Sequence, residues 1–155
     1  MEADDVEGAY QEFATLLRSG EFTSPVDGWS AENIGAHVSL NNDEIASVAE
    51  AVGRGEFPAY DNSSGVDEDN LGEFTVRVGG RDGVALAIEN SARRLAQSLR
   101  QLQGDAARVE VPVHIVDNGT VVVDRPLAIG DLIIGNVTFH LASHLEQLRE
   151  LSHDE

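Results

Sequence analysis

The sequence predicts an all-α protein: a four-helix bundle with a small β-hairpin before the last helix. Four segments carry apolar residues at helical spacings of three and four, and such stripes are stable only when they are buried against one another. A short segment between the third and the fourth alternates in the manner of a strand, and a tight-turn signal follows it. With 155 residues, 41% of them hydrophobic, the chain can enclose one core, so we expect a single domain over residues 1–155.

The first two predicted helices are joined by a loop rich in turn-forming residues. The first helix ends at Gly20, and its apolar stripe consists of Val6, Tyr10, Phe13 and Leu17. The second begins after the N-cap candidate Ser30 and extends to about residue 53. The segment from Gly55 to Gly72 is polar and contains further turn formers, which predicts a long loop.

The third predicted helix, residues 82–102, has the most regular apolar pattern in the chain. Its stripe consists of Val84, Ile88, Ala92, Leu95, Leu99 and Leu102. Residues 109–116 then alternate as a strand, and the sequence DNG at 117–119 is a strong signal for a hairpin turn. Pro112 within this strand favours an exposed two-stranded ribbon over a central position in a sheet. The last helix is expected from about Ile129 to Ser152.

The composition excludes several classes of partner. The chain has 28 acidic and 10 basic side chains and a formal net charge of −18, so it repels nucleic-acid backbones and anionic membrane surfaces. It has no cysteine, which excludes disulfides, thiolate metal ligands and a cysteine nucleophile. The N-terminus lacks the features of a secretory signal, and no apolar stretch reaches the ~20 residues of a membrane helix. We therefore expect a cytoplasmic protein.

Three of the five histidines lie on the apolar faces of predicted helices. His140 and His144 are four residues apart, which brings both imidazoles to one helix face and within reach of one ion. His37 projects from the apolar face of the second helix. A single histidine at such a position is usually a hydrogen-bonded core residue, but three of them on two helices favour a metal site. His114, in the hairpin, and His153, near the C-terminus, are expected at the surface.

Two motifs together resemble the DinB/YfiT-like superfamily, which includes the metal-binding domain of mycothiol-dependent maleylpyruvate isomerase and related thiol-dependent transferases. They are G-W-S-x3-I-x2-H-V at residues 28–38 and H-x3-H-x2-Q-L at residues 140–148. The resemblance implies an up-up-down-down four-helix bundle that holds a divalent ion, zinc or nickel, on His37, His140 and His144. Maleylpyruvate isomerases of this kind carry a further C-terminal domain, so we do not expect isomerase activity on maleylpyruvate.

A site with three neutral imidazoles leaves a divalent ion with open positions, which is typical of a catalytic centre. Such an ion can activate a thiol as a thiolate, and the absence of cysteine means that the thiol must be a cosubstrate. The resemblance implies that this cosubstrate is a low-molecular-weight thiol, which is conjugated to a small-molecule substrate. The leading hypothesis is therefore a metal-dependent enzyme of the thiol S-transferase type. The segment lacks the Glu of the His-Glu-x-x-His motif, which disfavours a zinc protease.

Further polar residues lie near the histidines in the predicted helices. Asn41 and Asn136, each one helical turn from a predicted ligand, are candidates for orienting the imidazoles around the bound cofactor. Glu44 is a candidate catalytic base, and Arg81 is a candidate clamp for a substrate carboxylate. Trp29 is expected to pack at the start of the second helix. Each of these residues also has an ordinary interpretation, as a solvated side chain or a packing contact.

A second hypothesis for the function is a non-catalytic four-helix bundle that binds a metal ion or a small ligand and dimerises through exposed helix faces. It predicts metal binding without turnover of thiols and electrophiles. An open cleft beside the ion favours the enzyme, whereas a closed site favours the binding protein.

Overall fold

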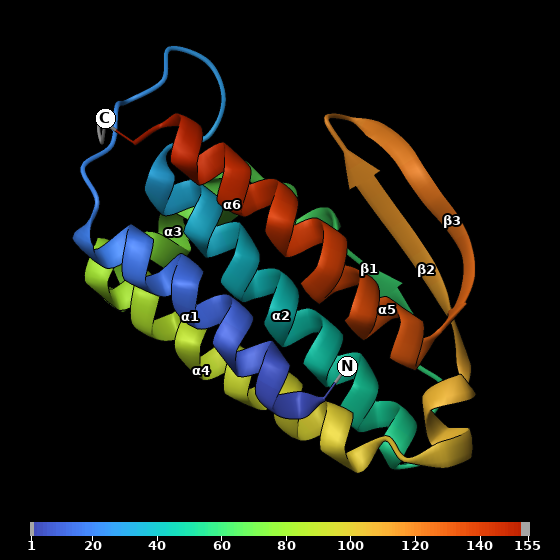
Figure 1. Ribbon diagram of the computed structural model, residues 1–155. Helices are drawn as coiled ribbons and strands as arrows, with labels where there is room; N and C mark the ends of the chain where they lie inside the picture. Colours follow the sequence, from blue (N-terminus) through green and yellow to red (C-terminus); the bar gives the residue numbers. More distant parts are fainter. Residues whose placement is uncertain (1, 153–155) are drawn as a thin grey trace.

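The structure, a computed structural model, describes residues 2–152 and is mostly helical (Figure 1). Its helices are α1 (Ala3–Ser19), α2 (Ala31–Gly53), α3 (Glu68–Val78), α4 (Arg81–Gln101), α5 (Ile129–Gly135) and α6 (Leu141–Glu150). Beside the helices lies a three-stranded sheet in the order β1 (Tyr60–Asp61), β2 (Glu110–Asp117) and β3 (Thr120–Ala128). The predicted hairpin before the last helix is therefore present as β2 and β3. None of the described helices is long and apolar enough to cross a membrane.

Ion pairs near the helix ends define the directions of α1, α2 and α4. Arg100, near the end of α4, pairs with Asp4 in the first turn of α1 at 2.9 Å, so these two helices are antiparallel. Glu32 and Arg81 lie in the first turns of α2 and α4 and also pair at 2.9 Å. Helices α2 and α4 are therefore parallel.

The last helical segment runs antiparallel to α2, because His37 contacts His140 whereas Asn41, one turn later in α2, contacts Asn136. In chain order the four long segments α1, α2, α4 and α5–α6 thus run up, down, down and up (Figure 1). The expected up-up-down-down order is wrong. The connections explain the difference: the loop between α1 and α2 reverses the chain at one end, whereas residues 54–80 return along the bundle and bring the start of α4 beside the start of α2.

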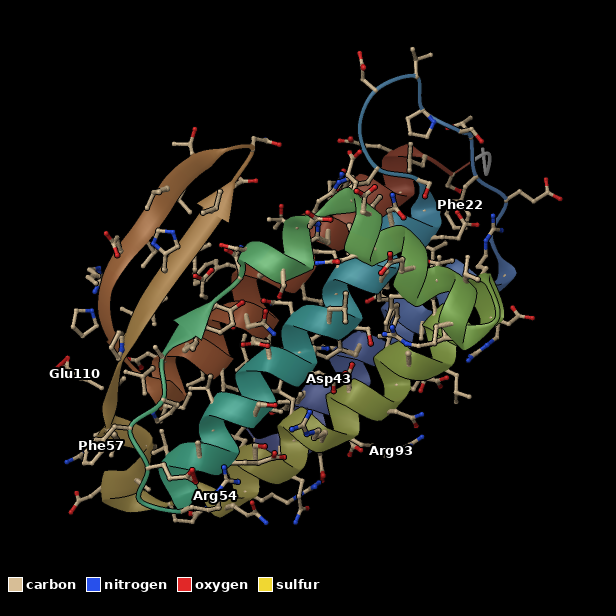
Figure 2. All side chains as sticks on the ribbon, turned by 180° about the vertical axis from the view of Figure 1, so that it is seen from behind. Phe22, Asp43, Arg54, Phe57, Arg93 and Glu110 are labelled. Atoms are coloured by element: carbon tan, nitrogen blue, oxygen red, sulfur yellow. The ribbon has the colours of Figure 1, made fainter. Side chains whose placement is uncertain are left out.

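The predicted apolar stripes of α1 and α4 face a common core. The stripe of α1 is fully buried, as are the residues of α4 from Val84 to Leu95 that belong to its stripe. Helix α2 is buried around most of its circumference, since it contacts α1, α3, α4 and the last helical segment. Charged side chains lie outside this core, and Figure 2 labels Asp43, Arg54 and Arg93 on the outer side of α2 and α4.

Gly35 allows α2 to approach its neighbours closely. A Cβ atom at this position would lie 2.7 Å from Leu17 Cδ2 in α1 and 2.8 Å from Val84 Cγ1 in α4. We expect Gly35→Val to lower the free energy of unfolding by about 1–3 kcal/mol, because the added methyl groups overpack the core. Gly8→Val is the matched control, since a Cβ at Gly8 meets nothing within 4 Å. Urea denaturation measures both variants, and equal midpoints would contradict this packing.

The predicted loop from Gly55 to Gly72 contains secondary structure that the sequence did not indicate. Strand β1 pairs in parallel with β2, a 3₁₀ turn follows at Ser63–Val66, and α3 begins at Glu68. The side chain of Asp67 caps α3 by accepting a backbone hydrogen bond, and Gly79 ends the helix with a φ of 94°. Strand β1 has two residues, and its hydrogen-bonding partner lies some fifty residues later in the chain. No local pattern reveals such a strand.

The last helix is interrupted by a π-helical turn, Asn136–His140, between α5 and α6. The N–H of Leu141 donates to the carbonyl of Asn136, five residues earlier, instead of four as in an α-helix. The expected helix over 129–152 is therefore three helical segments, of which α6 ends at Glu150. Such turns are frequent at functional sites, and this one carries both Asn136 and His140.

Candidate metal centre

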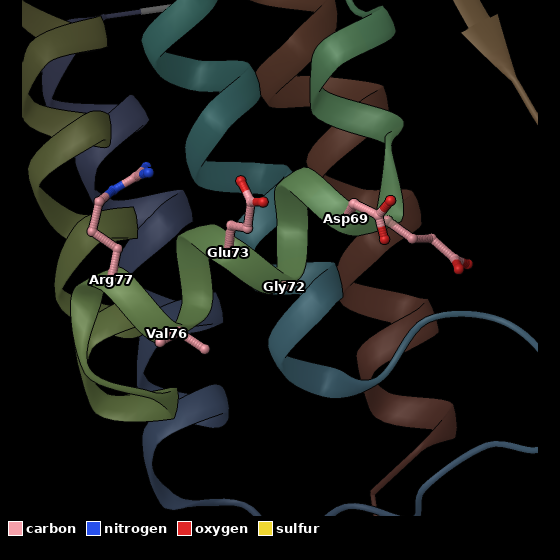
Figure 3. Close-up of a pocket in the computed structure, with 6 residues that line it drawn as sticks. Asp69, Gly72, Glu73, Val76 and Arg77 are labelled. Carbon is pink, nitrogen blue, oxygen red and sulfur yellow. The ribbon is translucent and has the colours of Figure 1, made fainter.

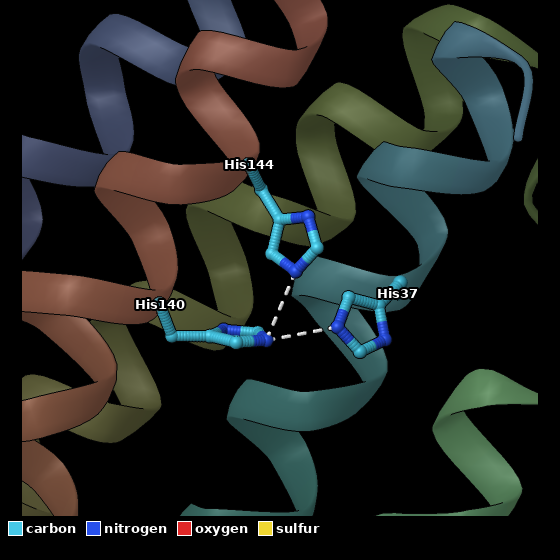
Figure 4. Close-up of side chains that lie close together, drawn as sticks. All are labelled: His37, His140 and His144. Atoms are coloured by element: carbon cyan, nitrogen blue, oxygen red, sulfur yellow. Dashed lines mark hydrogen bonds between the residues drawn. The ribbon is translucent and has the colours of Figure 1, made fainter. Parts of the chain in front are cut away.

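The structure brings His37, His140 and His144 together between α2 and the last helical segment (Figure 4). His37 comes from α2, His140 ends the π-helical turn, and His144 lies one turn later in α6. The Nε2 atom of His140 lies 2.9 Å from Nε2 of His37 and 3.1 Å from Nε2 of His144. Three ring nitrogens from two parts of the chain therefore converge on one point.

Hydrogen bonds at Nδ1 orient two of the three imidazoles. Nδ1–H of His37 donates to the carbonyl of Gly65 at 2.6 Å, since a carbonyl oxygen can only accept. Nδ1–H of His144 donates to Oε1 of Gln147 at 2.9 Å. Because Nδ1 carries the proton in both rings, each Nε2 carries a lone pair directed at the third histidine. Two lone pairs that converge in this way need a cation or a proton between them.

Burial keeps the three imidazoles neutral. Burial, together with a smaller effect of the neighbouring histidines, lowers the pKa of His37 to about 4 and that of His140 to about 2, and the hydrogen bond to Gly65 opposes the shift at His37. Burial also lowers the pKa of His144, although its hydrogen bond to Gln147 opposes the shift. Neutral imidazole is the form that binds metal ions. The protonation state of the triad at neutral pH therefore suits a metal ligand set.

The spacing of the nitrogens also suits a divalent ion. Zinc–nitrogen bonds are about 2.0–2.1 Å long, so two imidazoles on one ion have their nitrogens roughly 3 Å apart. The contacts of 2.9 and 3.1 Å to Nε2 of His140 match that separation. Imidazole is a common ligand of zinc, nickel, copper and iron. The described residues thus fit a divalent transition-metal ion held by three neutral donors.

A buried polar network supports the triad. Asn41 Nδ2 lies 3.4 Å from Nδ1 of His140 and donates to Oδ1 of Asn136 at 2.6 Å. Asn136 Nδ2 in turn donates to the hydroxyl of Tyr10 at 2.7 Å and to Oδ1 of Asn42 at 2.9 Å. The network ties α1, α2 and the π-helical turn together next to His140. Of the two predicted residues, Asn41 contacts an imidazole, that of His140, whereas Asn136 contacts Asn41, Tyr10 and Asn42.

Several residues of the site were not singled out by the sequence. Tyr60 donates its hydroxyl proton to Asn41 Oδ1, yet it lies in the segment expected to be a loop. The sequence indicates Tyr10 only as one member of the apolar stripe of the first helix, although its hydroxyl belongs to the network. Gly65 contributes a backbone carbonyl, which no side-chain pattern can indicate. Gln147 belongs to the second of the two motifs, and that motif is the one signal that could have identified it.

Trp29 lies against two of the histidines as well as at the start of α2. Its ring centroid is 4.9 Å from that of His37 and 6.3 Å from that of His144. Trp29 is the one tryptophan of the chain. Its fluorescence therefore reports on the immediate surroundings of the triad.

The two catalytic candidates Glu44 and Arg81 are not part of the triad. Glu44 is exposed on α2, close enough to Tyr60 that, besides burial, its charge contributes to the raised pKa of the Tyr60 hydroxyl. Arg81 donates to Glu32 at 2.9 Å and to the carbonyl of Gly20 at 3.1 Å, and its guanidinium lies 5.0 Å from the ring centroid of Phe22. These contacts join the end of α1 to the starts of α2 and α4.

The two remaining histidines are separate from the triad. His114 lies in β2, partly exposed, with its Nδ1 3.5 Å from the carboxylate of Asp124. The prediction that His153 lies at the surface concerns a position outside the described residues.

A cavity of about 360 Å³ lies beside His140. Its walls come from α2, all three strands and the last helical segment, and Asn41 and Tyr60 of the polar network line it. Another hollow, shown in Figure 3, is lined by α3 alone, through Glu68, Asp69, Gly72, Glu73, Val76 and Arg77. A hollow on the face of one helix is open surface and contains none of the histidines. Of these two, only the cavity beside His140 contacts the triad, through His140 itself.

Neither a protein family model nor a curated protein sequence matches this chain. A comparison with solved structures finds the crystal structure of the mycothiol-dependent maleylpyruvate isomerase, with a TM-score of 0.63 and 17% sequence identity. The match covers 96% of this chain and 57% of the isomerase chain. The chain therefore shares its fold with part of that isomerase over nearly all of its own length, and it spans little more than half of the isomerase chain.

Proposed function

Starting from this shared fold, we propose that the chain is a metal-dependent enzyme of the thiol S-transferase type. It holds a divalent ion, zinc or nickel, on His37, His140 and His144, and it activates a low-molecular-weight thiol cosubstrate there. The observation that carries the proposal is the convergence of three neutral imidazole nitrogens, with Nε2 contacts of 2.9 and 3.1 Å, beside a cavity. Residues 1–155 act as one metal-binding domain, in the cytoplasm, on a small-molecule substrate.

The thiol must come from outside the protein, because the chain has no cysteine. A divalent ion at the triad would lower the pKa of a bound thiol and so supply a thiolate nucleophile. The fold is that of a protein named for its dependence on mycothiol, which makes mycothiol the first thiol to test.

The chain's own residues contribute orientation and shielding. Gly65 and Gln147 hold two imidazoles with Nε2 directed inward, and the Asn41–Asn136 pair fixes the turn that carries His140. Trp29 covers His37 and His144 on one side, while the cavity reaches His140. The cavity gives a thiol or a second substrate a path to His140.

Metal binding is the first test. We expect one divalent ion per chain by elemental analysis, and we expect Ni²⁺ to quench the fluorescence of Trp29, which lies 4.9 Å from His37 between ring centroids. His37→Ala and His144→Ala should each weaken binding by more than about 100-fold, since even the groups that orient metal ligands contribute about 10–100-fold. His114→Ala is the matched control and should retain the ion. Full occupancy in His37→Ala would contradict the proposed ligand set.

Turnover separates the enzyme from the second hypothesis, a non-catalytic metal- or ligand-binding bundle that dimerises. The metal-loaded chain is incubated with mycothiol and a panel of electrophiles, and loss of free thiol is followed by mass spectrometry. Thiol conjugation that disappears in His37→Ala supports the transferase. Stoichiometric metal without conjugation supports the binding protein, and sedimentation then tests for the dimer.

A further inference from the structure

The cavity beside His140 has walls that are mainly apolar. Its apolar lining comes from Ile45 of α2, from Ile115 and Leu127 of the sheet, and from Leu132 and the largely exposed Phe139 of the last helical segment. Its volume of about 360 Å³ is near the lower end of the roughly 300–1,000 Å³ of small-molecule sites. The walls therefore suit a compact apolar ligand.

The charge of the lining is negative or neutral throughout. Asp131, exposed at the rim, is its one ionisable acid, and none of the residues that line it is an arginine. The chain as a whole carries a formal net charge of −18. A carboxylate or phosphate that entered would lose its hydration without meeting a cationic partner from the lining, and such a transfer is costly.

Several buried polar groups of the lining already donate hydrogen bonds within the protein. The hydroxyl of Tyr60 donates to Asn41, and burial raises its pKa, so the phenol remains protonated. Asn41 donates to Asn136, and the amide of Asn62 is hydrogen-bonded to both the N–H and the carbonyl of Val116. Toward a ligand, the oxygen of Tyr60 can therefore accept a hydrogen bond but has no proton to give.

We propose that this cavity binds a neutral, mainly apolar small molecule that donates a hydrogen bond, and that it rejects carboxylates. The inference rests on the proposed function, for which it names the class of the second substrate: an uncharged electrophile that reaches the triad past His140. The absence of a cationic group and the acid at the rim disfavour an anionic ligand. The acceptor on Tyr60 favours a ligand that donates a hydrogen bond.

Benzamide and benzoate are a matched pair of probes, equal in shape and different in charge. Isothermal titration at pH 7 is run on the full chain after dialysis against EDTA, because a bound ion would itself attract benzoate. We expect benzamide to bind at least about tenfold more tightly than benzoate, a difference of roughly 1.4 kcal/mol. Equal or tighter binding of benzoate would overturn the proposal, and so would the absence of binding by both probes.

Gly135 allows the location of the site to be tested without disturbing the fold. It lines the cavity, its backbone is helical at φ −62° and ψ −39°, and a Cβ there would meet nothing within 4 Å. Gly135→Leu should therefore fill the cavity and remove benzamide binding, whereas Gly8→Leu, in an open position of α1, should leave it unchanged. Unaltered binding in Gly135→Leu would show that the ligand lies elsewhere.

Asp131 tests the role of charge. Asp131→Arg should increase the affinity for benzoate at least about tenfold, and Asp105→Arg, the same charge change at an exposed position of the turn Gly104–Arg108, should not. An equal increase in benzoate affinity in both variants would mean that the effect comes from the net charge of the chain and not from the cavity, and it would contradict the proposal. Quenching of Trp29 by Ni²⁺ is measured separately. If it fails while benzamide still binds in the cavity, the proposed metal enzyme is wrong and the ligand preference stands.

Discussion

The Asn136→Leu variant is expected to lose about 3–9 kcal/mol of unfolding free energy, a large share of the roughly 5–15 kcal/mol of a typical domain. Asn136 is 5% exposed and accepts a hydrogen bond from Asn41 while it donates to Tyr10 and Asn42. Leucine has a similar volume but leaves these three buried groups without their partner, at about 1–3 kcal/mol for each.

Chemical denaturation of the metal-free chain measures this loss, and Asn90→Leu is the matched control. Asn90 is exposed on α4 and accepts a hydrogen bond from Arg93 in solvent, so the same substitution there should change stability by less than about 0.5 kcal/mol. We also expect Asn136→Leu to weaken metal binding about 10–100-fold, because Asn136 fixes the turn that carries His140. Equal denaturation midpoints for the two variants would show that the network does not hold the turn.

The metal-free protein is expected to lose stability as the pH falls below about 6.5, the ordinary pKa of histidine. Burial lowers the pKa of His37 to about 4 and that of His140 to about 2, so below pH 6.5 the unfolded chain binds protons that the folded chain excludes. The stability of the neutral triad is therefore fully present above pH 6.5. For each histidine, this contribution to the free energy of unfolding is lost completely only below the pKa that the histidine has in the folded protein.

The expected loss is large because each unit of pKa difference corresponds to about 1.4 kcal/mol. His37 alone contributes about 3 kcal/mol between pH 6.5 and pH 4. Urea denaturation at pH 7, 6 and 5 measures the slope, and His37→Gln removes one of the titrating groups. The variant should lose less unfolding free energy over this range than the wild type does. A wild-type stability that stays constant from pH 7 to pH 5 would mean that the histidines are not buried as neutral rings.

Much of the helical framework could be predicted because its signals are local. The third predicted helix, 82–102, is observed as Arg81–Gln101, and the hairpin turn at 117–119 lies between β2 and β3 as expected. In both segments the spacing of apolar residues and the turn-forming residues act over a few positions. Helix α3 was missed, since its two fully packed apolar residues, Leu71 and Phe74, are too few to define a stripe.

The order of helix directions could not be predicted in the same way. It depends on how residues 54–80 connect α2 to α4, and this segment contains β1, which pairs with a strand much later in the chain. The resemblance to a family implied up-up-down-down, whereas contacts between distant residues make the order up-down-down-up. Residues 54–80 contain a strand and a helix and span the length of the bundle, so α4 runs parallel to α2. The segment between α1 and α2 is only a loop, so the chain reverses direction there.

By itself, the sequence determined which side chains form the candidate set of metal ligands. Three histidines on apolar helix faces, in a chain without cysteine, leave imidazole as the natural metal ligand, and their helical spacing places each toward the core. Only the tertiary structure decided how they are held. The carbonyl of Gly65, the hydroxyls of Tyr10 and Tyr60 and the cavity beside His140 come from parts of the chain that carry no local signal of function. The physical reason is the sequence distance over which each feature acts. Apolar periodicity depends on residues a few positions apart, whereas a hydrogen bond to a buried imidazole needs a group from a distant part of the chain that folding brings within about 3 Å.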